Sequence, residues 1–188
     1  AFQNYDALLK ENETLKDQLE QSQKQVAQYQ QNSYELERLQ ALYELDLQYY
    51  DYKKTAARVI SKDTGGWFQV FYVDKGTDDG VVEGCNVMYG NGLCGIVTEA
   101  GKDYAKVRAI IDDTSNVNGM ILPSEAICNV EGSASNYENG YLIAENIDKD
   151  AEVEVGDQVV TSYVSSKYLS GINIGYVTKI EEDSNNLT

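Results

Sequence analysis

The side chains that most often carry enzyme chemistry are sparse in this sequence. It contains no histidine, which removes the commonest general base, the Ser-His and Cys-His nucleophile pairs, and most zinc and iron sites. Adjacent carboxylates occur at residues 78–79, 112–113 and 181–183. Neighbours on a strand point to opposite faces, whereas a glycosidase needs two carboxylates that face each other across about 5–10 Å. We therefore predict that the chain is not an enzyme, with no catalytic residue and no cofactor.

The thiols do not form a recognisable metal or redox motif either. The three cysteines, Cys85, Cys94 and Cys128, are odd in number and lack a C-x-x-C spacing. Cys85 and Cys94 lie in apolar, strand-like runs, where cysteine usually acts as a small buried hydrophobe. We therefore expect no metal ligands, and we do not assign a disulfide.

Charge excludes a further class of partner. The chain has a net charge of −16, with 7 basic and 10 acidic side chains in residues 1–60 and 8 basic and 21 acidic side chains in residues 61–188. A region this acidic repels phosphate backbones and anionic lipid head groups, so we expect no nucleic-acid partner. No apolar run in the sequence approaches the roughly 18 residues that cross a bilayer.

The first fifty residues predict a long helix, because all fifteen glycines and the only proline lie after residue 64. A 3-4 spacing that starts at Tyr5 gives two rows of positions, and ten of the fourteen are apolar or aromatic. This pattern is typical of a coiled coil sustained over roughly six to seven heptads. The predicted interface consists of Tyr5, Leu8, Asn12, Leu15, Leu19, Val26, Tyr29, Leu36, Tyr43 and Leu47.

A seam this narrow covers too little apolar surface to stabilise one helix, so it indicates a second helix, and we expect a homodimer. Asn12 at an a-type position favours a parallel pair in fixed register, and Glu11 and Lys16 would form a pair of opposite charge between the copies. An antiparallel dimer stays open from the sequence alone. The other alternative is a helix that packs on its own globular region.

Residues after the helix alternate between short strands and turns. Residues 56–60, 67–73, 86–89, 93–98, 105–111, 116–122 and 126–132 read as strands, residues 141–144 begin another, and Gly/Asp turns separate them. Residues 133–140 read as a polar, flexible loop. Short strands at about ten-residue spacing indicate a small barrel or sandwich.

These elements resemble a known family, the rod shape-determining protein MreC. The resemblance spans about residues 53–180. The structural positions of the family motif are Trp67, Gly76, Gly80, Gly84, Gly92, Gly95, Gly156, Asp157, Ser162, Gly171 and Gly175. The chain departs from the family motif between residues 163 and 173, where Tyr163, Tyr168-Leu169 and Asn173 replace Gly, Phe-Pro and Pro.

The resemblance implies a mainly β fold: two small antiparallel barrels of a six-stranded type behind a coiled-coil helix. We predict a coiled coil over residues 1–52 and a barrel region over residues 53–188, with a second barrel at roughly residues 105–155 inserted in the first. We also expect the chain to be cut at both ends, with an anchor before it and further strands or a tail after it.

For function, the resemblance implies a scaffold of the bacterial cell-wall elongation machinery that maintains cell shape. Its implied partners are a class B penicillin-binding protein, MreD and, through the cytoplasm, MreB. The implied location is the extracytoplasmic face of the cell membrane. The alternative is a periplasmic adaptor of the membrane-fusion type, which also joins coiled helices to β-barrels but usually has two antiparallel helices.

Overall fold

The computed structural model describes residues 2–48, 52–63 and 69–181. The chain divides into two units, residues 1–51 and residues 52–188, called here the helical unit and the β unit. Each unit is described by itself.

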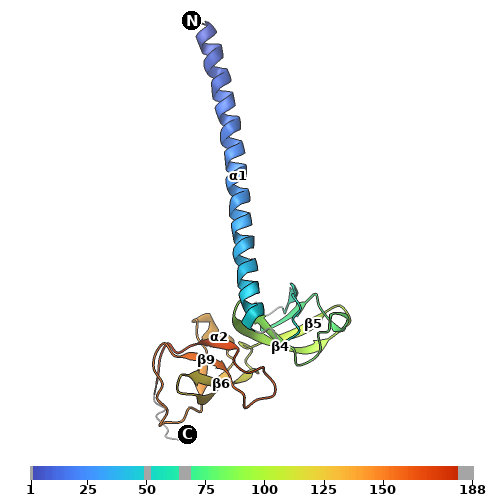
Figure 1. Ribbon diagram of the computed structural model, residues 1–188, viewed down its shortest axis with the longest axis vertical. Coiled ribbons are helices and arrows are strands. Elements are labelled where there is room, and N and C mark those ends of the chain that lie inside the picture. Colours follow the sequence, from blue (N-terminus) through green and yellow to red (C-terminus); the bar gives the residue numbers. More distant parts are fainter. Residues whose placement is uncertain (1, 49–51, 64–68, 182–188) are drawn as a thin grey trace. The chain divides into compact units, whose positions relative to one another are not determined.

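The helical unit contains one uninterrupted helix, α1 (Phe2–Gln48), of 47 residues (Figure 1). At about 1.5 Å per residue it is about 70 Å long. Every α1 side chain that the structure describes is exposed to solvent. The predicted long N-terminal helix is therefore confirmed, whereas its pairing with a second helix stays a prediction.

The described residues of the β unit form ten strands and two short helical turns. The strands are β1 (Val59–Lys62), β2 (Val70–Val73), β3 (Asn86–Tyr89), β4 (Gly92–Ala100), β5 (Ala105–Ala109), β6 (Asn116–Leu122), β7 (Ala126–Glu131), β8 (Ile143–Glu145), β9 (Gln158–Thr161) and β10 (Asn173–Tyr176). The helical turns are η1 (Thr77–Asp79) and α2 (Ala134–Glu138). The prediction of a mainly β region after a single helix is confirmed.

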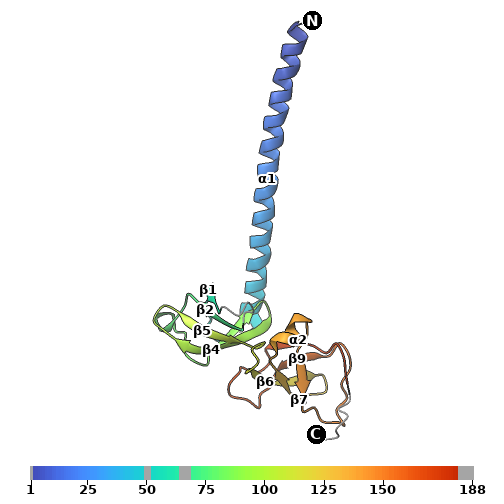
Figure 2. The same cartoon turned by 180° about the vertical axis from the view of Figure 1, so that it is seen from behind.

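The strands pair in the order β1-β2-β5-β4-β10-β9-β6-β7-β8, and β3 pairs with β4 beside this path. Figure 2 shows β1, β2, β4 and β5 as one group and β6, β7 and β9 as another. Neighbours on the path are antiparallel except for β10 and β4, which run parallel and share the single pair Asn173 and Gly92. On its other side β10 pairs with β9.

The expectation of two barrels is wrong in one respect, because the described sheet is not closed into a barrel. The described strands form one open path whose ends, β1 and β8, do not pair with each other. The physical reason lies in β10, because its edges are used to join the first strand group to the second. The boundaries of an inserted region at about residues 105–155 stay a prediction.

The segment predicted as a flexible loop at residues 133–140 contains a short helix instead. Ser133 begins it: its hydroxyl oxygen accepts a hydrogen bond from the backbone N–H of Asn136 at 3.3 Å. A serine in this position satisfies one of the backbone donors that a helix leaves unpaired at its start. The polar composition thus reflects helix capping rather than a lack of structure.

The core follows the predicted alternation of strand residues. In β5 the first, third and fifth residues are buried, and Lys106 and Arg108 between them are half-buried. Val107, Ile121 and Ile172 are fully buried, with 0% exposure. Full burial of such a side chain stabilises a fold by about 1.5–3 kcal/mol. The β unit thus builds a core from its own residues.

Candidate functional site

The helical unit presents an exposed apolar seam. The described seam side chains are between 52% and 73% exposed: Leu8, Leu15, Leu19, Val26, Tyr29, Leu36 and Tyr43. The side chains of Tyr5 and Leu47 lie outside the described part of the structure. Exposure of apolar surface to water is unfavourable, and this row of side chains is exposed along most of the helix.

Polar side chains interrupt this seam. Asn12, Ser22, Ser33 and Gln40 are exposed at seam positions. Tyr34 and Leu39, 70% and 53% exposed, lie off the strict register and widen the apolar surface. The ion pair between Lys24 and Glu20, at 2.7 Å, is solvent-exposed on both sides, and such a pair contributes only about 0.2–1 kcal/mol.

In the β unit, Asn86 of β3 holds the loop at residues 163–170, which we call the clamped loop. The Asn86 side-chain amide donates to the carbonyl oxygen of Lys167 at 3.3 Å, and its oxygen accepts from the backbone N–H of Leu169 at 2.7 Å. The Ser162 hydroxyl oxygen accepts from the backbone N–H of Val164 at 3.1 Å. These bonds fix both ends of a loop that runs far from β3 in sequence.

Tyr168 anchors the same loop in the core. Its side chain is only 4% exposed. Burial raises the pKa of the Tyr168 hydroxyl, while its hydrogen bond with Ser115 and the charge of Arg108 lower it. Ser115 directly precedes β6, the first strand of the second group.

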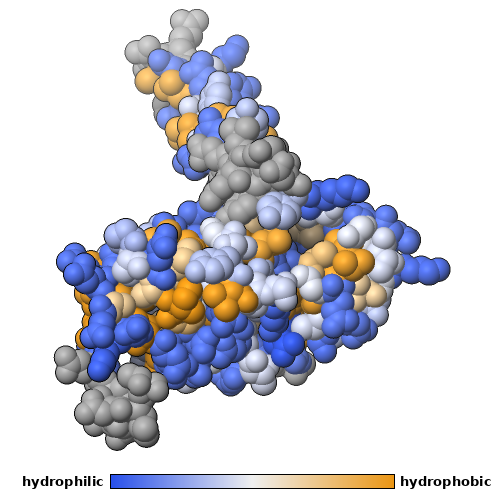
Figure 3. All heavy atoms as spheres, turned by 60° about the horizontal axis from the view of Figure 1, so that its bottom comes forward, coloured by the Kyte–Doolittle hydropathy of each residue, from blue (hydrophilic) through white to orange (hydrophobic). Residues whose placement is uncertain are grey.

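While its base is fixed, the clamped loop keeps apolar side chains in solvent. Tyr163 is 71% exposed and Val164 is 60% exposed, and Tyr89 at the end of β3 is 85% exposed. Figure 3 shows that apolar side chains gather into patches on the face of the β unit seen there. Exposed apolar groups on a fixed backbone are typical of protein-binding surfaces, because little conformational entropy is lost on binding.

The glycines of the family motif serve turns and close approaches. Gly80, Gly84, Gly156 and Gly171 have positive φ angles of 84°, 89°, 105° and 84°, a region that favours glycine. A Cβ at Gly76 would overlap the carbonyl oxygen of Gly101, and one at Gly95 would overlap that of Arg108. Gly92 and Gly175 have no such restriction. Trp67 lies outside the described residues.

The two polar motif residues also have structural contacts. The Asp157 carboxylate accepts a hydrogen bond from the backbone N–H of Glu154 at 2.9 Å, which closes the turn before β9. Ser162 is fully buried, and its backbone N–H donates to the carbonyl oxygen of Asn118 at 2.8 Å. Both residues therefore shape the approach to β9 and the clamped loop.

Three carboxylates of the adjacent groups, Asp79, Asp112 and Asp113, make contacts in turns. Asp79 pairs with Lys75 at 2.9 Å, and this hydrogen bond, with one from the Gly76 N–H, lowers its pKa. Asp112 accepts from the N–H of Thr114 and Asp113 from that of Ala134, both at 2.9 Å. A general acid needs a raised pKa, so the lowered pKa of Asp79 does not suit that role.

The three thiols are free, and burial raises the pKa of two of them. Burial raises the pKa of the Cys94 thiol, and it raises that of Cys128 to about 11. All three cysteines are unbridged. Because the thiolate is the reactive form, Cys94 and Cys128 are inert packing residues.

In residues 2–48, 52–63 and 69–181, no three His, Cys, Asp or Glu side chains are grouped closely enough to hold a metal ion. Among the helices of these ranges, none combines the length and the apolarity that a bilayer span requires.

Sequence reasoning missed Asn86 as the residue that fixes the clamped loop, and it saw Tyr168 only as a substitution for Phe. One signal for Asn86 was present, because asparagine is depleted in strands and here it starts the apolar run of β3. No local pattern indicates which distant loop it contacts, since 81 residues separate it from Lys167.

A long, exposed N-terminal helix followed by a small β unit of two joined strand groups defines a class of helix-and-β proteins. Within that class, the family model described as "Rod shape-determining protein MreC, barrel core" matches residues 59–188. This match covers well over half of the chain. The chain therefore belongs to the MreC family.

Two relatives are called cell shape-determining protein MreC. The protein of Listeria monocytogenes is 31% identical over 142 residues, which are 73% of this chain and 47% of that protein. The protein of Haemophilus influenzae is 26% identical over 176 residues, 94% of this chain and 49% of that protein. The chain spans about half the length of these relatives.

Solved structures show the same fold. A structure described as MreC matches with a TM-score of 0.71 and 24% identity, covering 81% of this chain and 85% of that one. MreC from Helicobacter pylori, solved in a complex with penicillin-binding protein PBP2, gives a TM-score of 0.56 and 18% identity over 69% of this chain and 80% of that one.

Proposed function

We propose that this chain is part of a non-catalytic scaffold of the bacterial cell-wall elongation machinery, which organises peptidoglycan synthesis and so maintains cell shape. The observation that carries the proposal is the match of residues 59–188 to the MreC barrel core. It is supported by relatives that are called cell shape-determining proteins. The arrangement of the described carboxylates and thiols in turns and core positions agrees with a binding role.

The helix supplies the dimer in this proposal. Two copies of α1 pair in parallel through the exposed seam, with Asn12 facing its counterpart and Glu11 facing Lys16 of the other copy. The seam leucines are the support for this step, since their exposure is otherwise unfavourable. Asn12, Ser22, Ser33 and Gln40 weaken the seam, so the dimer is loose unless other contacts reinforce it.

A class B penicillin-binding protein is the proposed docking partner of the β unit. Support comes from the Helicobacter pylori MreC, which has been solved in complex with PBP2. The exposed side chains of the clamped loop, Tyr163 and Val164, are the surface we propose for this contact. MreD and MreB complete the proposed machinery, and the location is the extracytoplasmic face of the cell membrane, with an anchor N-terminal to α1.

The mechanism is positional. A helix of 47 residues acts as a spacer of about 70 Å, and dimerisation presents two β units to the partners. A second binding event on a linked partner is then intramolecular, which strengthens the overall binding through effective concentration.

Analytical ultracentrifugation tests the dimer. The full chain is compared with a fragment that begins at Lys54, which contains most of the β unit. The full chain is expected to sediment as a dimer at high concentration and the fragment as a monomer. If both are monomers, the dimerising scaffold is refuted for this chain in solution.

A binding assay with the purified class B transpeptidase tests the docking. The Y163A/V164A double variant is expected to bind about ten- to hundredfold more weakly, because truncation of buried interface anchors costs about 1–3 kcal/mol. The matched control is Y137A, an exposed tyrosine of α2. No detectable binding of the unaltered dimer at high concentration would refute the docking proposal.

The transport-adaptor alternative gains no support from these observations. It predicts a second long helix antiparallel to the first. Within the described residues α1 is the only long helix, since α2 has 5 residues and η1 has 3.

A further inference from the structure

Strand β7 is longer than the strand that covers its outer edge. Its last three residues pair with β8, from Asn129 opposite Glu145 to Glu131 opposite Ile143. Its first residues, 126–128, pair with β6 on the inner side, and no described strand pairs with their outer side. The edge of β7 is thus open over three residues, or about 10 Å.

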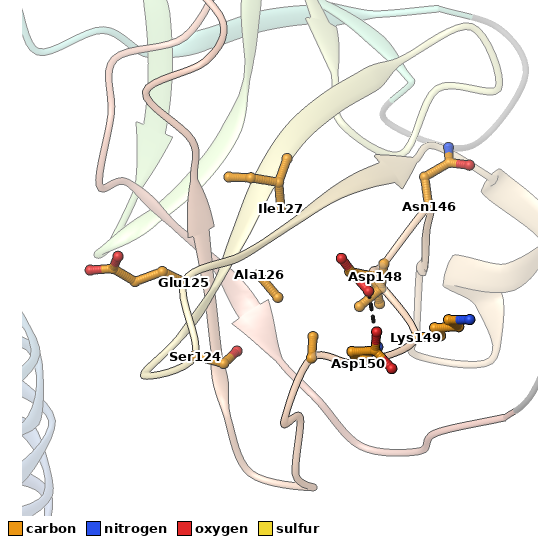
Figure 4. A pocket seen from close by; sticks show the side chains of 10 residues that line it. Ser124, Glu125, Ala126, Ile127, Asn146, Asp148, Lys149 and Asp150 are labelled. Carbon is orange, nitrogen blue, oxygen red and sulfur yellow. Dashed lines mark hydrogen bonds between the residues drawn. The ribbon is translucent and has the colours of Figure 1, made fainter. Parts of the chain in front are cut away.

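A hollow of about 670 Å³ lies beside this open edge. Residues 124–127 form one wall and residues 146–151 form the other. Figure 4 shows the loop that carries Asp148 and Asp150 on the far side of the hollow from Ser124 and Glu125. We call this hollow, with the open edge of β7, the β7 slot.

The backbone on both walls of the hollow turns away from the directions of the strands β7 and β8. β8 ends at Glu145, and Asn146 has a left-handed φ of 58°. Glu125, in the β6–β7 turn, has a φ of 58° as well. The two are the only described non-glycine residues with a positive φ. The local conformation therefore keeps the loop off the outer edge of β7 instead of letting it extend β8 there.

The lining combines apolar and acidic groups. Ala126, Ile127 and Ile147 supply apolar surface, while Glu125, Asp148 and Asp150 outnumber the single basic side chain, Lys149. The surroundings have the same sign, because residues 110–188 contain 3 basic and 14 acidic side chains. A ligand that pairs with the open backbone and carries positive charge would complement both features.

We propose that the β7 slot binds an extended, basic segment of a partner protein, which adds as a strand along residues 126–128. In such β-augmentation the main-chain hydrogen bonds supply affinity and the side-chain environment supplies specificity. Alternate side chains of an added strand point to opposite faces. The segment that fits therefore alternates basic side chains, directed at Asp148 and Asp150, with small aliphatic ones, directed at Ile127. This inference goes beyond the proposed function, because it assigns a second binding surface, separate from the clamped loop, and does not depend on the coiled coil.

The test uses the full chain and a short peptide of alternating lysine and valine. Two-dimensional NMR and amide hydrogen exchange follow the backbone N–H groups of β7. The expected result is shifts and slower exchange at residues 126–128 with the lysine peptide, and none with a peptide of alternating glutamate and valine. A lysine peptide that is N-methylated at every residue is expected not to bind, because neither of its edges can then donate a hydrogen bond to β7.

Matched variants separate the slot from general charge attraction. D148N/D150N is expected to weaken the lysine peptide about three- to tenfold, as for removal of exposed ion pairs. The asparagine oxygen still accepts the hydrogen bond that Asp148 takes from the N–H of Asp150. E152Q/E154Q removes the same charge from the same loop outside the lining, and it is expected to change the affinity less than twofold at about 0.15 M salt.

Three results would overturn the proposal. Equal weakening in both double variants would mean non-specific attraction to an acidic surface. Shifts confined to residues outside the slot, or tight binding of the N-methylated peptide, would exclude strand addition. Concentration-dependent protection of residues 126–128 without peptide would mean that a second copy of this chain occupies the slot. None of these results bears on the match to the MreC barrel core.

Discussion

The helical unit and the β unit differ in how far their apolar side chains are buried. In α1 the seam leucines are more than half exposed, while in the β unit Val107, Val117, Ile121 and Ile172 are completely buried. Both regions carry a regular apolar period, one of 3.5 residues and one of 2. The difference teaches that the strand pattern is satisfied by burial within the β unit, whereas the described apolar side chains of the helix pattern remain exposed.

The largest effect is expected in the β unit, which buries apolar side chains in a core of its own. The substitution Ile121→Ala removes a fully buried side chain from β6 and is expected to lower the free energy of unfolding by about 2–5 kcal/mol. Urea unfolding of the β unit measures it. The control Ile180→Ala, at a side chain 51% exposed, is expected to change little. Equal effects at the two positions would remove the distinction between core and surface.

The second effect tests the proposed pairing of two copies through the seam of α1. Leu19→Ala in the seam is expected to weaken the dimer by about 2–4 kcal/mol, since two leucines lose burial, one from each copy. Sedimentation equilibrium measures the dissociation constant. Gln18→Ala, next to the seam, is the matched control and is expected to leave it unchanged. Leu19→Ala should not alter the urea unfolding of the β unit. A changed midpoint would mean that the two units are coupled.

The third effect distinguishes two glycines of one strand, β4. Gly95→Ala forces a Cβ onto the carbonyl oxygen of Arg108 in the neighbouring strand, so the free energy of unfolding is expected to fall by about 1–3 kcal/mol. Gly92→Ala places a Cβ with its nearest contacts at 3.8 Å and is expected to be close to neutral. Urea unfolding measures both variants. Similar losses would contradict the role assigned to the close approach at Gly95.

The smallest effect concerns acid. The backbone hydrogen bond from Arg58, and then its side-chain hydrogen bond, lower the pKa of Asp74 below its ordinary value of 3.8. A lowered folded-state pKa stabilises the fold above the unfolded-state value, and this contribution is lost as the pH falls through the folded-state pKa. Stability is therefore expected to fall as the pH drops below about 4, and less steeply in Asp74→Asn. An unchanged slope in urea unfolding would contradict this link.

Local patterns predicted most of the elements. The strand at residues 116–122 was predicted with the bounds of β6, and the hairpin signal at residues 90–92 covers the turn between β3 and β4 and the first residue of β4. These succeeded because alternation and turn glycines act over a few residues. The predicted strand at residues 56–60 is displaced to Val59–Lys62, since its end depends on pairing with β2. The prediction of closed barrels failed because closure of a sheet depends on which strands, distant in sequence, pair at its two edges.

The candidate surfaces divide in the same way. The helix seam could be predicted because its residues recur within one helix, and the described members are exposed as a dimer requires. The clamped loop could not be predicted in this way, because its geometry depends on Asn86, which lies far away in sequence. The β7 slot could not either, since it arises from the unequal lengths of β7 and β8.

The sequence by itself determined a long glycine-free helix with an apolar seam, a glycine-punctuated β region and a resemblance to MreC. Composition, period and turn chemistry are local quantities, and they act before any tertiary contact forms. Only the tertiary structure decided that β10 joins the two strand groups, that Tyr168 anchors a loop with its neighbours in solvent, and that the edge of β7 stays open. These features depend on contacts between residues distant in the chain, which no local pattern specifies.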